Sequence, residues 1–484
     1  MGGENFKEES EQKNEDRVMI ISIAVDSIAG FDPEAVQQFQ KLVEVFNRHA
    51  WKNALKNRYY EGRVSLNEVN LGIALPEGLR GLEIGCSWGA KTVDVLASRS
   101  MFDGFVGQNG TEIDELTEIA DANRLIAEYM KACRDELKYG CSFATLSADP
   151  ELGCKIRFHS PESAAALWDG EKGRISCGFS VIDMEKTDYA GEEYRPSLIN
   201  YYTDEAIWVL QREGSSWFAK KHLHKMGRPL MEPLIWNATT GKPFGRSRIK
   251  EPVRRLIQGY VRTIANATIG LEFSTAPQKY ILGITDSQYD QIIDQKFKQY
   301  VGNIIASTTN PETGEKPTFG QLQQGSIAPH VEMMRVLATQ FSAATGLTVT
   351  DTGVVNDANP TSSDAILAQS QTLVSMAEQL NAGNGDALRM IALMALAIAN
   401  ECTIDELTDE QKSAIPHFKN PAMPSVAVTA DAAIKIASAR PNFAGTDTFL
   451  EMIGFDQADI RRIRAQEQRV EANALLLASM NGEE

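Results

Sequence analysis

The chain has 484 residues, of which 43% are hydrophobic and 23% charged, and its formal net charge is −17 at pH 7. This length exceeds what one hydrophobic core usually serves, and the composition is that of a folded protein, so two or more modules are expected. The acidity excludes a chain that grips a nucleic-acid backbone along its surface, because that affinity comes from lysine and arginine. It is compatible with an acidic conduit through which DNA slides, and also with acidity that only aids solubility.

The N-terminal part predicts a flexible arm followed by helices. Residues 1–30 begin with many Glu and Lys and lack a signal-peptide pattern, so we expect a cytosolic chain with a flexible acidic start. Apolar residues recur every three or four positions over residues 32–60, which predicts a helix. A second stripe of this kind predicts one helix over residues 112–138.

The apolar period falls towards two between residues 141 and 233. Short β-branched or aromatic runs alternate there with Gly, Asp or charged turns, which predicts an antiparallel sheet. The predicted strands cover residues 154–158, 175–182, 197–202, 206–211 and 216–219.

Two long helices are predicted on either side of a turn-rich stretch. The segment Phe-Gly-Arg-Ser-Arg-Ile at 244–249 opens an amphipathic helix over residues 247–273, about 40 Å long at about 1.5 Å per residue. Residues 308–317 are rich in turn formers and predict a hairpin or tip. A second helix begins near Pro329, which suits a first turn, and ends before Gly346.

The C-terminal part begins with a loop and continues as helices. Residues 347–360 have no helical or strict strand period, and a new helix is expected from Ser362 or Ser363 to about residue 380. We expect the sequence Asn-Ala-Gly-Asn-Gly at 381–385 to break the chain before a short buried helix at 388–399. Residues 430–480 predict helices broken near Pro441 and Gly454. The last of these carries the arginines Arg461, Arg462, Arg464 and Arg469.

In order and spacing these segments resemble the portal proteins of tailed bacteriophages, in the branch with long non-contractile tails. The resemblance covers about residues 40–460 and includes the segments that begin at Phe244, Ser274, Gly320, Thr345 and Asn359. It implies an α+β fold with a mixed wing, long stem helices, a small clip, a tunnel loop and a helical crown. The implied divisions are an N-terminal arm at 1–30, the wing at 31–245, the first stem helix at 246–273, the clip at 274–326, the second stem helix at 327–346, the tunnel loop at 347–361, its helix and the return to the wing at 362–429, and the crown at 430–484.

The same resemblance implies a homo-oligomeric ring of about twelve subunits at one vertex of the capsid. Double-stranded DNA would be packaged and ejected through this ring. The implied partners are the large terminase subunit, then the head-to-tail adaptor, and the major capsid and scaffolding proteins. The protein would be assembled in the host cytoplasm and reside in the virion, with no membrane, cofactor, metal or enzymatic activity.

Three groups of residues are the candidate sites under this resemblance. The tunnel-loop residues that would line the DNA channel are Val354, Val355, Asn356, Asp357, Ala358 and Asn359. The stem arginines Arg254, Arg255 and Arg262 would face either the channel or, as we prefer, acidic groups of a neighbouring subunit. The clip tip would carry Asn310, Glu312, Glu315 and Lys316.

Two alternatives remain open at this point. The sequence Gly-Leu-Glu-Ile-Gly-Cys-Ser-Trp-Gly-Ala at 81–90 resembles the first motif of S-adenosylmethionine-dependent methyltransferases, whose glycines let the backbone approach a cofactor. Against this alternative, Trp88 stands where a small residue is needed, and we interpret it as a packing residue of the wing. The other alternative is a scaffold protein without a pore, for which amphipathic helices would look the same.

Other chemistry has little support in the sequence. No nucleophile elbow, zincin helix or phosphate-binding P-loop motif is present, so any energy for DNA movement must come from a partner. The six cysteines lack metal-ligand spacing and predict free thiols in a reducing compartment. His222 and His224 alternate as on one strand face but have no further ligand nearby. The apolar stretch 388–399 is too short to span a bilayer.

Overall fold

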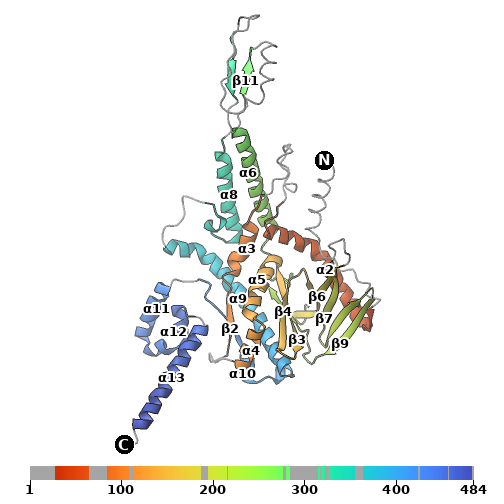
Figure 1. Ribbon diagram of the computed structural model, residues 1–484, viewed down its shortest axis with the longest axis vertical. Helices are drawn as coiled ribbons and strands as arrows, with labels where there is room; N and C mark the ends of the chain where they lie inside the picture. Colours follow the sequence, from red (N-terminus) through yellow and green to blue (C-terminus); the bar gives the residue numbers. More distant parts are fainter. Residues whose placement is uncertain are drawn as a thin grey trace.

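The computed structural model describes residues 28–64, 84–107, 113–186, 194–214, 216–275, 279–283, 314, 316, 318–321, 326–354, 363–422, 426–455 and 457–481. The molecule is elongated, with a central body of sheets and helices (Figure 1). Two long helices, α6 (Glu251–Thr275) and α8 (Ala328–Thr345), project from one end of the body. A two-stranded antiparallel sheet of β11 (Lys279–Leu282) and β12 (Thr318–Gln321) lies beyond their tips, and helices near the C-terminus project the other way.

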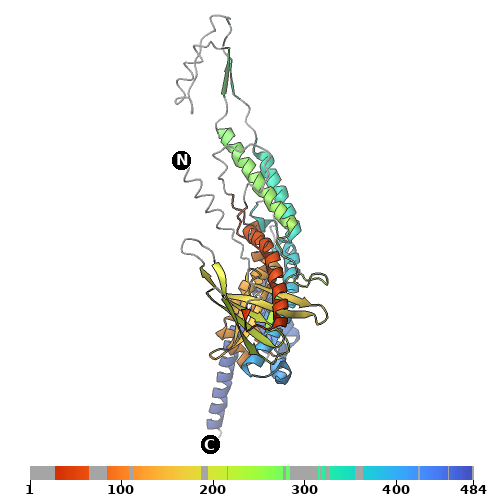
Figure 2. The same ribbon diagram turned by 90° about the vertical axis from the view of Figure 1, so that its right-hand side faces the viewer.

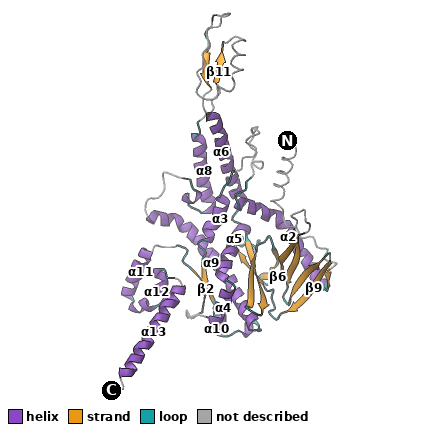
Figure 3. Cartoon of the chain, in the orientation of Figure 1, coloured by secondary structure: helices purple, strands orange, loops and turns teal. Residues whose placement is uncertain are grey.

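The strands of the body form two larger sheets, gathered on one side (Figure 3). The six-stranded sheet has the order β1 (Ile28–Ala29), β9 (Ser216–Leu223), β8 (Ala206–Glu213), β7 (Tyr194–Tyr202), β6 (Arg174–Lys186) and β5 (Ala164–Asp169). All its pairs are antiparallel except β1 with β9. The three-stranded antiparallel sheet has the order β10 (Met231–Ile235), β3 (Cys141–Asp149) and β4 (Gly153–His159).

Helix α2 (Pro33–Tyr60) covers the six-stranded sheet with an aromatic core. The Phe39 ring packs edge-on against Tyr201 at 5.4 Å and against Phe179 at 5.7 Å, and Phe46 also contacts Phe179. The period-two signal predicted five of these strands correctly. Within residues 141–235 it missed β3, β5 and β10, because β3 and β10 are largely buried and β5 is a short, alanine-rich run with no alternating pattern. The two-residue strand β1 lies outside that stretch and was not predicted.

The predicted helix over residues 112–138 is two helices, α4 (Asp114–Ala122) and α5 (Leu125–Tyr139), so that prediction was wrong in detail. Arg124 between them has a left-handed backbone with φ of 50°. Asn123 fixes the break, since its amide donates to the Cys154 carbonyl at 2.8 Å and its Oδ1 accepts from the Ile156 N–H at 2.8 Å. Strand β4 therefore gives the Asn123 side chain two hydrogen bonds, and these favour a break in the helix at this residue.

The predicted break at residues 381–385 was also wrong, because α9 runs without interruption over Ser363–Ala399. Asn384 is fully buried inside this helix, and its amide donates to Glu136 Oε2 at 2.8 Å and to Tyr129 OH at 3.0 Å. Gly385 faces Phe418 of β13 (Ile415–Phe418), and a Cβ there would meet the ring at an ordinary van der Waals distance of 3.8 Å. The small and polar residues thus serve helix packing here, and tertiary contacts override their turn preference.

Part of α9, Ser370–Ala399, is long and apolar enough to cross a membrane by length and composition alone, and 56% of its most apolar window is buried inside the protein. Leu388, Ile391 and Met394 are fully buried in the main core of the body. These contacts are those of a core helix, as the sequence predicted for residues 388–399.

Smaller elements complete the chain. Helix α3 (Trp88–Ala97) lies at the base of α6 and α8, and β2 (Phe102–Val106) pairs antiparallel with β13. The short helices η5 (Thr350–Thr352), η6 (Ile404–Glu406) and α10 (Asp409–Lys412) connect larger elements. The C-terminal helices are α11 (Val426–Ala439), η7 (Pro441–Gly445), α12 (Asp447–Ile453) and α13 (Gln457–Asn481), with breaks at Pro441 and Gly454 as predicted.

Candidate functional site

The two projecting helices form an antiparallel pair, and they lie side by side in both views (Figures 1 and 2). The apolar stripe of α6 is buried within the chain: Ile257 and Val261 are fully buried, and so is Phe341 of α8. A Cβ on Gly259 would lie only 3.3 Å from Leu337 Cδ2, so the glycine makes room for the side chain of α8. The predicted apolar face of the first long helix therefore packs on the second one and on the body.

An aromatic cluster fixes the base of this helix pair on α3. The Trp88 ring is stacked on Tyr260 of α6 with centroids 4.1 Å apart, and lies 4.5 Å from Phe341 of α8. Its Nε1 donates to the Thr352 carbonyl at 3.1 Å. We call Trp88, Tyr260, Phe341 and Arg248 the base cluster. Trp88 thus joins both long helices to η5, and its role is wider than packing within the body.

Arg248 is the charged member of the base cluster and only 7% exposed. Its Nε donates to the Thr92 carbonyl of α3 at 2.6 Å, and its Nη2 donates to the Thr345 carbonyl at the end of α8 at 2.7 Å. Burial lowers the pKa of the guanidinium to about 10, so it stays charged at neutral pH. A cation at a helix C-terminus is favourable, because the last carbonyls carry partial negative charge.

The segment before α6 is held against the C-terminus of α5. The Arg248 N–H donates to the Leu137 carbonyl at 2.9 Å, and Ser247 Oγ donates to the Lys138 carbonyl. Gly245 has φ of 66°, and a Cβ there would overlap the Trp236 carbonyl. The sequence around residues 244–249 is therefore an anchor that sets the direction in which α6 leaves the body.

The loop after α8 begins from the same cluster. Gly346 ends α8 with φ of 73°, and a Cβ there would overlap Met376 of α9. Ser342 Oγ donates to the Leu347 carbonyl at 2.6 Å, and Asp351 accepts from the Thr348 N–H at 2.9 Å. The first part of the predicted tunnel loop is thus an ordered turn tied to α8 and α3.

The predicted loop-lining residues divide into two groups. Val354 is half-buried and packs against the main core, so it lies where the chain leaves the body. The others lie outside the described residues; they are Val355, Asn356, Asp357, Ala358 and Asn359. Likewise, Lys316 of the predicted clip tip is exposed, whereas Asn310, Glu312 and Glu315 lie outside the described residues.

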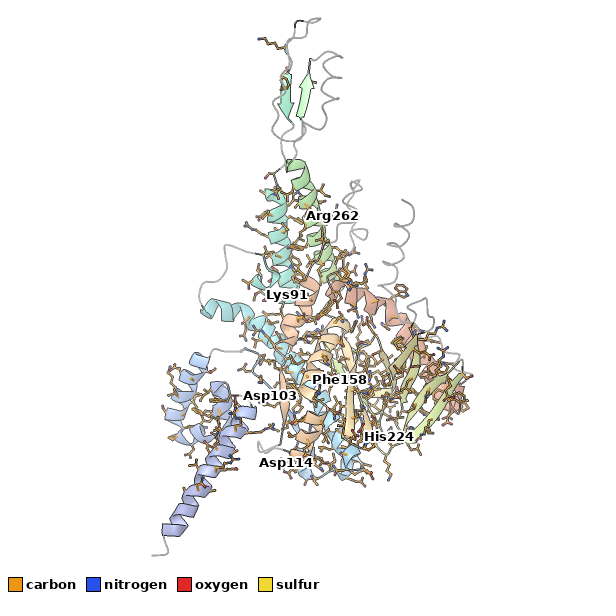
Figure 4. All side chains as sticks on the ribbon, viewed as in Figure 1. Lys91, Asp103, Asp114, Phe158, His224 and Arg262 are labelled. Atoms are coloured by element: carbon orange, nitrogen blue, oxygen red, sulfur yellow. The ribbon has the colours of Figure 1, made fainter. Side chains whose placement is uncertain are left out.

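The three predicted stem arginines have different surroundings. Arg254 donates from Nη1 to the Ile249 carbonyl at 3.1 Å, and its guanidinium lies over the Tyr59 ring of α2 at 5.9 Å, so it binds the body. Arg255 is exposed and pairs with Glu251 of the same helix at 3.4 Å. Arg262 is exposed further along α6, well away from Lys91 on α3 at the base (Figure 4).

The glycine-rich stretch at 81–90 has a packing role where the structure describes it, from residue 84 onwards. Trp88 and Cys86 are buried, and a Cβ on Gly89 would overlap the Tyr59 carbonyl of α2. Gly89 therefore lets α3 cross α2 at close range. No group of His, Cys, Asp and Glu that could hold a metal ion occurs among the described residues, which include His222 and His224. All six cysteines are free, and five of them are buried.

Sequence reasoning missed the base cluster as a unit. Arg248 lies in the segment 244–249, but nothing in the local pattern distinguishes it from Arg254 and Arg255, which follow it. Its position in the sequence could have indicated burial. Arg248 precedes the helix by three residues and is next to the apolar Ile249, which is fully buried.

Comparison with known proteins identifies one protein family. The model described as "Phage portal protein, SPP1 Gp6-like" matches residues 40–472. Comparison with curated proteins gave no match.

Solved structures include similar chains in gene transfer agent (GTA) particles. The chain is 12% identical to one from the virion of a native GTA particle, with a TM-score of 0.43, covering 73% of this chain and 86% of that one. For the neck of a native particle computed with C12 symmetry the identity is 13%, the TM-score 0.43 and the coverage 76% and 89%. For the neck of an empty particle computed with C6 symmetry the values are 12%, 0.43, 78% and 89%.

Proposed function

Because the chain belongs to the SPP1 Gp6-like family of phage portal proteins, a structural and non-enzymatic family, we propose that it forms a ring through which double-stranded DNA is packaged and ejected. The ring stands at one vertex of the capsid of a phage-like particle and contains about twelve subunits. The observation that carries this proposal is the family match over most of the chain. The long helix pair, anchored on a rigid body, supports it.

The architecture supplies a part for each function of such a ring. We assign the body to the wing, α6 and α8 to the stem, the β11–β12 sheet to the clip, residues 347–361 to the tunnel loop and the C-terminal helices to the crown. The base cluster is then the joint at which wing, stem and tunnel loop meet. A stiff joint keeps the loop at a fixed radius, because Trp88 of α3 donates to Thr352 in the loop and Arg248 links α3 to the end of α8 just before the loop.

The surfaces that remain apolar on one subunit support ring closure. On α8, the side chains of Val331, Met333 and Val336 are 41%, 47% and 42% exposed although the opposite side of the helix is buried on α6. Ile434 of α11 and Val470 of α13 are 59% and 67% exposed. Contacts between two different patches close a ring when the rotation between neighbours fits. We propose that neighbouring subunits cover these side chains.

Charge at the stem fits this arrangement. Arg255 pairs only weakly with Glu251, since both side chains are about 70% exposed, and such pairs contribute little. Arg255 is therefore suited to a contact with an acidic group of the next subunit, and we propose the same contact for Arg262, which is exposed on the same helix. The proposed partners outside the ring are the large terminase subunit, the head-to-tail adaptor, and the capsid and scaffolding proteins.

Electron microscopy of the purified protein in negative stain, with the mass measured by light scattering, tests the ring. We expect annular particles with a central channel and a mass near twelve times 53.3 kDa. Val336→Glu places a charge in the proposed contact and should lower the fraction of rings at least tenfold. Gln37→Glu, exposed on α2 of the body, is the control for added charge. A monodisperse monomer or dimer of the unmodified chain would favour a scaffold protein without a pore.

A further inference from the structure

A histidine on β13 lies between two carboxylates from different parts of the subunit. His417 Nδ1 is 3.9 Å from Asp103 Oδ2 on β2, and its Nε2 is 3.6 Å from Glu451 Oε1 on α12. The three side chains are only 14–33% exposed, so solvent screens them incompletely. Asp103 lies on the side of the body that faces the C-terminal helices (Figure 4). The His417 ring therefore bridges the body and those helices.

His417 is fixed to the body side of this contact. Strand β13 pairs with β2, where His417 is the partner of Gly104. Just after the strand, the Lys419 N–H donates to the Met101 carbonyl at 2.9 Å, and Arg99 donates to the Pro421 carbonyl at 2.8 Å. The ring position is thus set by backbone pairing that does not involve α12.

Glu451 belongs to a separately packed group of helices. Helix α12 packs on α11, η7 and α13. Arg464 of α13 donates to Asp447 of α12 at 2.7 Å and to the Gly445 carbonyl at 2.7 Å. These contacts hold the C-terminal helices to one another. A change at His417 would act on how the group sits against the body and would leave its internal packing intact.

The chemistry of imidazole makes this contact depend on protonation. A neutral ring has one N–H and one lone pair, so with a carboxylate at each nitrogen it must present the lone pair to one of them. His417 Nδ1 is buried and has no hydrogen-bond partner among the described residues. An imidazolium has N–H groups on both sides and attracts both carboxylates. Histidine is the side chain that ordinarily changes charge between pH 5 and 8.

The other charged groups near the ring do not remove this dependence. Lys419 Nζ lies 3.5 Å from Asp103 Oδ1, so Asp103 has a second cation in either state. Helix α9 also packs on β13. Its Asp386 and Arg389 line a groove together with Pro416 and Phe418 of the strand, and His417 does not line this groove. We propose that protonation of His417 fastens the C-terminal helices to the body through Glu451, and that deprotonation loosens them.

This latch rests on contacts within one subunit and is independent of ring formation. Hydrogen exchange measured by mass spectrometry on the full chain at pH 6.0 and 8.0, with times scaled for the intrinsic rates, tests it. We expect the peptide 447–455 to exchange about two- to fivefold more slowly at pH 6.0. The peptide 39–50, in the core beneath the six-stranded sheet, is the internal reference and should not change.

Three variants separate the latch from a general effect of pH. His417→Gln and Glu451→Gln should each abolish the difference between the two pH values in the peptide 447–455. Glu451 is 33% exposed on α12, so its substitution should leave the body folded if that of His417 does not. Glu467→Gln removes an ion pair with Arg464 inside the C-terminal helices and should keep the difference. Exchange of the wild type that is equal at both pH values, or a difference that persists in both latch variants, would overturn the proposal.

Discussion

Replacement of Arg248 by methionine tests whether the base cluster fixes the start of the proposed tunnel loop. The variant keeps most of the apolar volume but leaves the carbonyls of Thr92 and Thr345 without their donors at 2.6 and 2.7 Å. Hydrogen bonds to a charged group contribute about 1.5–3 kcal/mol each. The guanidinium has also been taken out of water, and the loss of that desolvation cost offsets part of the effect. We expect the local free energy of opening to fall by about 2–4 kcal/mol.

Hydrogen exchange in peptides that cover residues 341–354 measures this change directly. At about 1.4 kcal/mol for each factor of ten, exchange there should become about 30- to 1,000-fold faster. Arg248→Lys keeps the charge but reaches fewer acceptors, so its local free energy of opening should fall by about half as much. Arg255→Met is the matched control, because Arg255 is exposed, and it should change stability by less than about 0.5 kcal/mol. Exchange within twofold of the wild type in Arg248→Met would refute the role of Arg248 as an anchor.

Three further changes test other parts of the structure. Glu136 is fully buried, and burial raises its pKa from 4.5 to about 8, so its contribution to stability is present below about pH 4.5 and is lost as the pH rises to about 8. In thermal unfolding, the free energy of unfolding of Glu136→Gln should therefore rise relative to that of the wild type by about 1.4 kcal/mol per pH unit between about pH 4.5 and 8. A difference between the two proteins that does not change with pH would contradict this. Gly89→Ala should destabilise by about 1–3 kcal/mol, because its Cβ meets the Tyr59 carbonyl, whereas Gly270→Ala, which meets nothing, should be neutral or slightly stabilising. Asp357→Arg should slow DNA packaging through attraction to phosphate, and packaging at the wild-type rate would count against a loop that faces DNA.

The sequence predicted those elements whose signals are local. Pro329 and Gly346 gave the bounds of α8 to within a residue, because a first-turn proline and a left-handed glycine are set by backbone sterics alone. The strands with alternating side chains were also predicted, because the alternation is visible within a few consecutive residues. Helix α9 was predicted as two pieces, because the small and polar residues 381–385 are typical of a turn. In the folded chain the cost of burying Asn384 is offset by Glu136 and Tyr129, which lie more than 240 positions away in the sequence. No window of sequence contains those partners.

The base cluster at the candidate site could not be predicted from the sequence for the same reason. Arg248, Arg254 and Arg255 follow one another closely, yet one is buried on two carbonyls, one lies against Tyr59 and one is exposed. The difference arises because α3 and the end of α8 meet beside Arg248, and that meeting is a property of the assembled body. A joint of this kind couples the direction of the long helices to the start of the loop, since Trp88 stacks on Tyr260 of α6 and donates to the Thr352 carbonyl in the loop. The helix pair and the loop should therefore move together, and a change that frees one of them from the base cluster should loosen the other.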